Sequence, residues 1–270
     1  MEYEGEYLFN KKWNGKGYDE YGNIIYELNN GNGEIKEYYL GNLIFEGKYL
    51  NGKCNGEGKE YSNGKLLFEG EFKNGERNGK GKAFCDNILI YEGEYLNNEK
   101  NGKGKEYYSN GKLMFEGEFV NDKKFSGKGY DCNNNIIYEL KNGNGLFKEY
   151  SAFGDKILFE CEYKNGKENG KGKEYYDDYR LSFEGEYKNG ERNGKGKEYK
   201  DNQVIFEGEY LDGKIWNGKG KVYIDSFGNT PVFIGEYLNG KRWNGIGVDF
   251  DEYRAVRYSN GEKNDSLLVQ

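Results

Sequence analysis

The sequence predicts an all-β protein, an elongated single-sheet solenoid of about eleven stacked antiparallel β-hairpins. Three observations support this fold class: the composition, a repeated aromatic-Glu-Gly-Glu-aromatic string, and a Gly-x-Gly pair that keeps phase with that string. Among the 270 residues only 35 % are hydrophobic and 32 % are charged, which is too polar for a thick core. Yet 17 % are aromatic, whereas disordered chains are poor in aromatic residues. This mixture is typical of short strands, tight turns and a thin core.

The aromatic string alternates apolar and charged residues, as in Phe68–Phe72 (FEGEF), and this alternation is the period of a half-buried strand. Its copies, including two degenerate units, begin at residues 3, 26, 45, 68, 91, 115, 138, 159, 183, 206 and 233. The spacings between these starts range from 19 to 27 residues, around a period of about 23. Eleven units therefore fill the chain to about residue 247.

A Gly-x-Gly pair follows in every unit, from Gly15/Gly17 to Gly245/Gly247. Glycine inside a strand weakens it, so its recurrence implies that a ring or a backbone approaches closely at these positions. Because no single unit can bury its aromatic residues alone, the units are expected to stack on one another.

One unit, residues 68–84, illustrates the expected hairpin. The loop KNGERN separates FEGEF from GKGKAF, and Asn74-Gly75 favours a turn with positive φ. Antiparallel pairing predicts that Glu71 lies near Lys80, Gly70 near Gly81, and Glu69 near Lys82. One face of the sheet then carries a ladder of Glu and Lys, and the other carries rings and glycines. Side chains alternate between the two faces of a strand, so Tyr61, three residues after Gly58, is expected on the charged face unless a β-bulge intervenes. The sequence leaves this open.

The repeat array also contains a longer duplication. Residues 14–38 match residues 126–150 at an offset of 112, which predicts that a five-unit block has been copied. Each block holds one shortened unit, at Tyr26–Gly33 and Tyr138–Gly145, in which Leu28 and Leu140 replace the strand glycine. The predicted organisation is a repeat array over residues 1–247, with similar blocks at about 1–111 and 113–225 and one further repeat, followed by a C-terminal cap and tail over residues 248–270.

The residue types present exclude several kinds of chemistry. There is no histidine, which removes Ser-His-Asp and Cys-His catalysis and imidazole metal sites. Cys54, Cys85, Cys132 and Cys161 form no CxxC motif and are expected to be free thiols in a reducing compartment. Regularly repeated strand glutamates are solubilising charges rather than a glycosidase pair. The Gly-x-Gly pairs lack the strand–loop–helix context of a phosphate-binding loop. The sequence thus predicts a protein that is not an enzyme, with no cofactor and no metal.

Charge and hydropathy restrict the location and the partners. No window approaches the ~20 apolar residues that a membrane span needs, and the first residues contain no apolar signal region. A cytoplasmic location is therefore expected. The net charge of -7 argues against nucleic acid as a partner.

These motifs resemble a known repeat. YEGEY or FEGEF, then NGxxNGKG, then an aromatic residue near YSNGKL, is similar to the MORN (membrane occupation and recognition nexus) repeat over residues 3–247. The resemblance implies stacked hairpins that serve as scaffolds at membranes or the cytoskeleton, and in some relatives phosphoinositide binding. Both shortened units and Cys161, which replaces a strand glycine, depart from the pattern. The YSNGKL-like strings also resemble bacterial repeat proteins described as antitoxins.

The aromatic row is the first candidate binding site, because a contiguous apolar stripe often marks an interaction surface. The stacking of units also needs these rings as core, and the two roles are compatible. The hypothesis is that a partner protein binds along a groove of rings, with three tryptophans near the hairpin tips as anchors. The residues are Tyr7, Tyr49, Phe72, Tyr95, Phe119, Tyr163, Tyr187, Tyr210 and Tyr237, with Trp13, Trp216 and Trp243.

Repeated NGKGK lysines offer an alternative, an anionic phospholipid surface that gains about 1 kcal/mol per basic residue. Against it, each lysine has a candidate Glu across the hairpin. These residues are Lys80, Lys82, Lys103, Lys105, Lys171, Lys173, Lys195 and Lys197. A further alternative is a regulatory or antitoxin-like subunit of a separate enzyme. Exposed strand edges at the ends also make a homodimer through a terminal repeat an open expectation.

Overall fold

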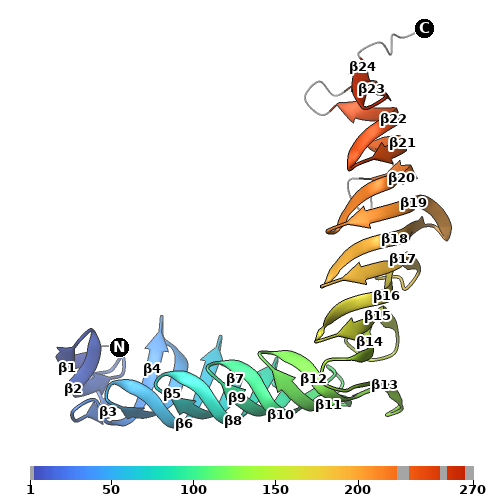
Figure 1. Ribbon diagram of the computed structural model, residues 1–270. Coiled ribbons are helices and arrows are strands. Elements are labelled where there is room, and N and C mark those ends of the chain that lie inside the picture. The colour runs from blue at the N-terminus through green and yellow to red at the C-terminus, as the bar shows by residue number, and fades with distance from the viewer. Residues whose placement is uncertain (1–2, 224–230, 250–253, 265–270) are drawn as a thin grey trace. The chain divides into compact units, whose positions relative to one another are not determined.

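The computed structural model describes residues 3–223, 231–249 and 254–264, which form β-strands and turns (Figure 1). No helix occurs in these ranges, and hence none that could span a membrane. The strands form three antiparallel sheets, and each strand pairs only with strands next to it in the sequence. The predicted all-β class with antiparallel strands is thus confirmed. The chain divides into two compact units, Met1–Lys141 with Ala152–Asp155, and Asn142–Ser151 with Lys156–Gln270, and each is described by itself.

The first compact unit contains two sheets. The strands of the smaller sheet are β1 (Tyr3–Leu8), β2 (Lys11–Tyr18) and β3 (Ile24–Leu28). The strands of the larger sheet are β4 (Gly33–Tyr39), β5 (Asn42–Leu50), β6 (Lys53–Ser62), β7 (Lys65–Lys73), β8 (Glu76–Cys85), β9 (Ile88–Leu96), β10 (Glu99–Tyr107), β11 (Leu113–Val120), β12 (Lys123–Tyr130) and β13 (Ile136–Leu140).

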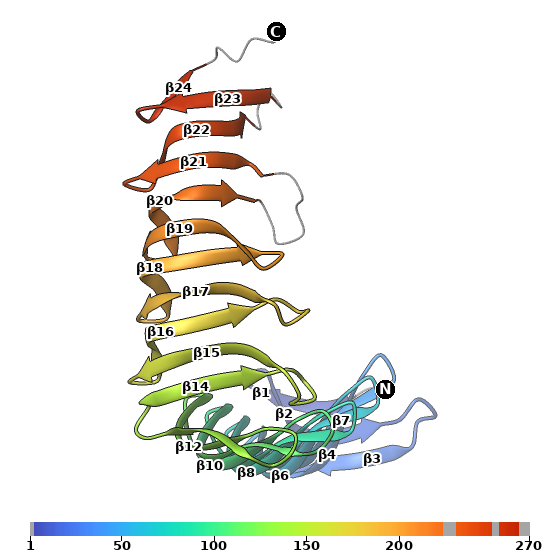
Figure 2. The same ribbon diagram turned by 90° about the vertical axis from the view of Figure 1, so that its right-hand side faces the viewer.

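The second compact unit contains one sheet, whose strands follow one another as rungs (Figure 2). They are β14 (Gly145–Tyr150), β15 (Ile157–Lys164), β16 (Lys167–Tyr175), β17 (Leu181–Lys188), β18 (Glu191–Lys200), β19 (Gln203–Leu211), β20 (Lys214–Val222), β21 (Phe233–Leu238), β22 (Lys241–Asp249), β23 (Arg254–Ser259) and β24 (Glu262–Asn264). The last two strands lie in the predicted cap, where Tyr258 packs edge-on against Phe233 at 5.7 Å. Residues 250–253 and 265–270 of the predicted cap and tail lie outside the described residues.

The register of the hairpin β7–β8 agrees with the sequence at two of three positions. Glu69 pairs with Lys82 and Gly70 with Gly81, as expected. Glu71 does not pair with Lys80, because the register shifts between Gly70 and Phe72. This bulge changes the role of Glu71: its Oε1 accepts a hydrogen bond of 3.3 Å from the backbone N–H of Lys80. A carboxylate that the sequence assigned to a charge pair therefore satisfies an unpaired backbone donor instead.

Glycine pairs across the strands explain how the rings lie flat. A Cβ on Gly70 would approach the Cα of Gly81 at 2.5 Å, so only glycine allows the strands to come this close. A Cβ on Gly81 would meet Phe68 Cζ at 2.4 Å, because that ring lies directly over the glycine. The recurring Gly-x-Gly pair is therefore a ring-docking position, as the sequence indicated.

The expected single sheet is interrupted at the shortened units, where bulky residues stand at glycine-pair positions. Leu28 is the last residue of β3, and Ile35 in β4 lies opposite Gly47. Both side chains are almost completely buried. Two branched side chains cannot approach as two glycines do, and one sheet ends at β3 while the next begins at β4. The same substitution recurs with Leu140 in β13, where a sheet ends, and Phe147 in β14, where the next begins.

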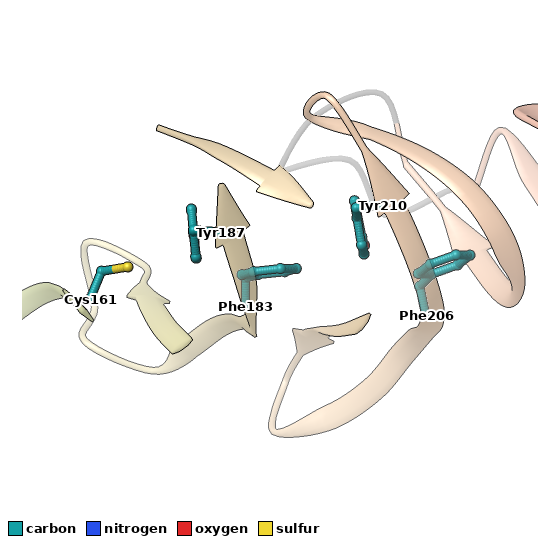
Figure 3. Packing of buried hydrophobic residues seen from close by; sticks show 5 residues of the cluster. All are labelled: Cys161, Phe183, Tyr187, Phe206 and Tyr210. Atoms are coloured by element: carbon teal, nitrogen blue, oxygen red, sulfur yellow. The ribbon is translucent and has the colours of Figure 1, made fainter. Parts of the chain in front are cut away.

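Aromatic rings form the core along one face of each sheet. Phe68, Tyr91 and Phe115 are fully buried, and successive rings meet edge to face, as Phe68 and Tyr95 do at 5.1 Å. Figure 3 shows the corresponding cluster of the second compact unit, with Phe183, Tyr187, Phe206 and Tyr210 beside Cys161. Edge-to-face pairs of this kind add about 0.5–1.5 kcal/mol each beyond the burial of their area.

Candidate binding surfaces

The face opposite the rings carries an open groove in the first compact unit, which we call the charged groove. It has a volume of about 1190 Å³ and crosses strands β4 to β11. Its floor is formed by the glycine-rich strand centres, including Gly58, Gly81 and Gly104, and its walls by glutamate and lysine side chains. A Cβ at these glycines would point at the rings of the other face, and Gly58 and Gly81 are buried, so the floor is strand backbone between the charged side chains.

One row of the charged groove alternates in sign from strand to strand. Each residue of this row stands opposite the next in the strand register, as Lys59 stands opposite Glu69 and Glu69 opposite Lys82. The row consists of Lys36, Glu46, Lys59, Glu69, Lys82, Glu92, Lys105 and Glu116. Cross-strand pairs of opposite charge contribute about 0.2–1 kcal/mol each, and the exposed ones lie at the low end.

Tyrosine hydroxyls bind two glutamates of the charged groove. Tyr61 donates a hydrogen bond of 2.7 Å to Glu46, and Tyr107 donates one of 2.6 Å to Glu92. Burial and then the neighbouring Glu46 raise the pKa of Tyr61 to about 12, so its hydroxyl remains a donor at neutral pH. The contact also places Tyr61 on the charged face, which the sequence had left undecided.

The second compact unit has a smaller groove of the same kind, of about 650 Å³. Glu160, Lys173, Glu184, Lys197 and Glu207 form its alternating row in the strand register. Tyr199 donates a hydrogen bond of 2.6 Å to Glu184, one of the glutamates of this groove. The repeat therefore builds the same surface in both units.

All eight lysines proposed for lipid binding line these grooves, Lys80, Lys82, Lys103 and Lys105 in the first and Lys171, Lys173, Lys195 and Lys197 in the second. The structure brings them together with glutamates rather than into a uniformly basic face. Lys105 lies 3.3 Å from Glu116, Lys173 lies 3.8 Å from Glu160, and Lys197 lies 3.2 Å from Glu207.

The predicted aromatic row lies on the other face, mostly in the core. Phe72, Tyr95, Phe119, Tyr187 and Tyr210 are buried. Tyr49, Tyr163, Tyr237, Trp13, Trp216 and Trp243 are partly exposed, and Tyr7 is 59 % exposed. Five of these twelve rings thus belong to the core behind the groove, and the role of the row in binding a partner stays a prediction.

A layer of cations over the rings was missed by the sequence reasoning. The guanidinium of Arg192 lies 3.9 Å from the centre of the Phe183 ring, and Arg77 lies 4.4 Å from the ring of Phe68. Each cation stands opposite the second ring of its hairpin, as Arg192 stands opposite Tyr187. We call this position the cation slot. Its signal is a basic residue five positions after the second ring, found at Lys12, Arg77, Lys100, Lys124, Arg192 and Arg242.

Buried carboxylates complete this layer. Glu106 is only 9 % exposed and lies 2.5 Å from Lys100 and 3.0 Å from Lys124. Burial opposes the charged form of Glu106, but Lys124 and Lys100 outweigh it and hold its pKa below the ordinary value. The pKa of Glu174 is likewise lowered, because Arg192 offsets the burial. Paired charges therefore cover the aromatic face. Because the cations are partly shielded from water, their contacts with the rings are stronger than they would be at an exposed site.

The four cysteines have different environments. Cys54 and Cys161 are buried and free, and burial raises the pKa of both thiols to about 12. Cys85 is exposed. In the part of the chain that the structure describes, no group of His, Cys, Asp and Glu is arranged to hold a metal ion.

Comparison with known families agrees with this architecture. The family model of the MORN repeat matches residues 45–65, 68–87, 91–112, 160–179 and 183–204. No curated protein matches the chain. The matched segments cover hairpins in both compact units and include strands of both grooves, β6 to β10 in the first and β16 to β18 in the second.

Proposed function

Because this chain is a MORN repeat protein, we propose that it is a non-enzymatic scaffold or adaptor that holds a partner polypeptide along the charged groove. MORN repeats generally serve as scaffolds or adaptors and generally lack enzymatic activity. The observation that carries the proposal is the groove of about 1190 Å³ across strands β4 to β11. Its charges stand at the fixed strand spacing of about 4.8 Å, so it offers many weak contacts at defined positions.

The alternating row favours a partner with charges of both signs. The charged groove is lined by nine glutamates and seven lysines, a net charge of 7 − 9 = −2. An anionic lipid surface would place phosphates against the carboxylates on every second strand, as at Glu69 and Glu92. Like charges opposed in this way destabilise binding, which makes the lipid the weaker candidate. A polypeptide with acidic and basic side chains can meet both signs.

The aromatic row contributes to this function indirectly. Its buried rings fix the strand register that spaces the groove charges. A direct role for exposed rings such as Tyr7 is a separate prediction, because Tyr7 lies on the other face.

The test exchanges charges within the groove while keeping the net charge. Lys82→Glu with Glu92→Lys inverts two neighbouring positions of the row, which stand opposite each other. The matched control, Lys73→Glu with Glu76→Lys, makes the same exchange at the tip of a hairpin, outside the groove. Proteins captured by the wild-type chain should be lost with the groove variant and retained with the control. Equal capture by all three proteins would reject the groove as the binding surface.

Two further measurements separate the alternatives. Sedimentation with phosphatidylserine vesicles at two salt concentrations tests the lipid hypothesis, since binding through lysines must weaken as salt rises. If the captured partner is an enzyme whose activity the full chain alters, the regulatory alternative gains support over a passive scaffold.

A further inference from the structure

One hairpin of the second compact unit has an acid in its cation slot. In β15–β16, Tyr163 stands opposite Glu168, at the position where Tyr187 stands opposite Arg192 in the next hairpin. Glu168 therefore stands at the register position that Arg192 holds in the next hairpin. The strand register around this ring is otherwise the same as in the neighbouring unit.

The neighbouring unit shows what the slot holds when it is filled. Phe183 is flanked in register by Glu174 on one side and Glu198 on the other. Arg192 lies over this ring at 3.9 Å and donates hydrogen bonds of 2.9 Å to Glu174 and 3.2 Å to Glu198. A ring with a carboxylate on each side is thus a guanidinium site in this protein.

Phe159 is likewise flanked in register by two carboxylates, one of which also pairs with Arg192. Glu149 stands opposite Phe159 on β14, and Glu174 stands opposite it on β16. Phe159 is partly exposed, whereas Phe183 is completely buried under its arginine. Glu149 is exposed, and Glu168 accepts a hydrogen bond of 2.5 Å from Tyr163. Within the described residues of this compact unit, neither Glu149 nor Glu168 forms an ion pair with a lysine or arginine.

We infer that this open cation slot receives an arginine side chain of a partner protein. Glu149 and Glu168 supply the negative charge, because Glu174 is already paired with Arg192, and Phe159 supplies a partly exposed ring. A planar guanidinium can stack on a ring while donating to carboxylates at its edge, which an ammonium group cannot do as well. This site lies on the aromatic face, so it is distinct from the charged groove and does not depend on it.

The probe is arginine amide, titrated into the full chain and followed by the NMR signals of Phe159 and Tyr163. Citrulline amide, which has nearly the same shape without the charge, should bind at least about tenfold more weakly, a difference of ~1.4 kcal/mol. Lysine amide should also bind more weakly than arginine amide. Equal shifts with arginine and citrulline amides would overturn the proposal.

Variants localise the effect. Glu168→Gln should weaken arginine amide binding by about threefold through loss of one partly exposed charge, whereas Glu207→Gln, which removes a glutamate of the opposite face, should leave it unchanged. Glu168→Arg fills the slot from within the chain, as Arg192 does, and should abolish the shifts at Phe159. It should also raise the melting temperature, because the new guanidinium can pair with Glu149. A Glu168→Arg protein that is less stable than wild type, or that still binds arginine amide at Phe159, contradicts the inference.

Discussion

Substitution of Gly81 by alanine tests whether the glycines are docking positions for rings. The added Cβ would lie 2.4 Å from Cζ and 2.5 Å from Cε2 of Phe68. Phe68 is completely buried, so its ring cannot swing into solvent. Gly81 lacks the positive φ seen at many glycines here, and alanine therefore fits its backbone. Overpacking of this kind costs about 1–3 kcal/mol, and the lower unfolded-state entropy of alanine offsets about 0.4–1 kcal/mol. We expect a net loss of about 1–2 kcal/mol.

Urea unfolding followed by circular dichroism measures this loss, and two companion variants isolate its cause. Phe68→Leu shortens the offending side chain, so Gly81→Ala should cost much less in that background, and the double-mutant cycle gives the coupling. Gly64→Ala is the control for backbone strain alone, because Gly64 has φ of 75° and no atom within 4 Å of its Cβ position. If the cost of Gly81→Ala is zero, or is the same with Leu at position 68, the ring-docking explanation is wrong.

Three more predictions concern the buried charges and thiols. Arg192→Gln should destabilise the protein by about 2–3 kcal/mol in urea unfolding, because it removes charged hydrogen bonds and a cation–ring contact; an unchanged midpoint would show that the layer is dispensable. Glu106 and Glu174 have pKa values lowered from 4.5, so the stability they contribute is present above that pH and is lost as the pH falls through their depressed values; an acid titration with constant stability from neutral pH to pH ~3 would contradict this. Iodoacetamide should label Cys85 in the folded protein much faster than Cys54, whose pKa is raised to about 12 by burial; equal rates by peptide mass spectrometry would refute the assignment.

The strand pattern was predictable because local alternation and glycine spacing determine it. The pairs Glu69–Lys82 and Gly70–Gly81 follow from counting residues along both strands away from the turn. The pair Glu71–Lys80 is absent from the register because a bulge adds two residues on β8 only, and no alternation of apolar and charged residues reveals such an insertion. The same parity rule correctly favours the charged face for Tyr61, which the hydrogen bond to Glu46 establishes.

The placement of the grooves and the sheet ends depends on contacts between units, which a single repeat does not display. The sequence shows that Leu28 departs from the glycine pattern, but one bulky residue can still face a glycine, as Leu28 faces Gly15. The sheet ends at β3 because Ile35 on the following strand is bulky as well. In six hairpins a basic residue stands five residues after the second ring, and this spacing alone could have revealed the cation slot. The sequence analysis assigns these basic residues no role, because Arg77 and its counterparts fall in the segment that it predicts as the hairpin loop.

The strict neighbour-to-neighbour order of the strands has a consequence for how the protein is made. Each strand finds its hydrogen-bonding partner within a short stretch of chain, so closing a hairpin requires little loop entropy and ordering can begin before synthesis ends. Growth proceeds by zippering one rung onto the last, and a defect in one rung leaves the earlier rungs paired. Whole rungs can accordingly be gained or lost by the gene, which lengthens or shortens the molecule without redesign of what remains.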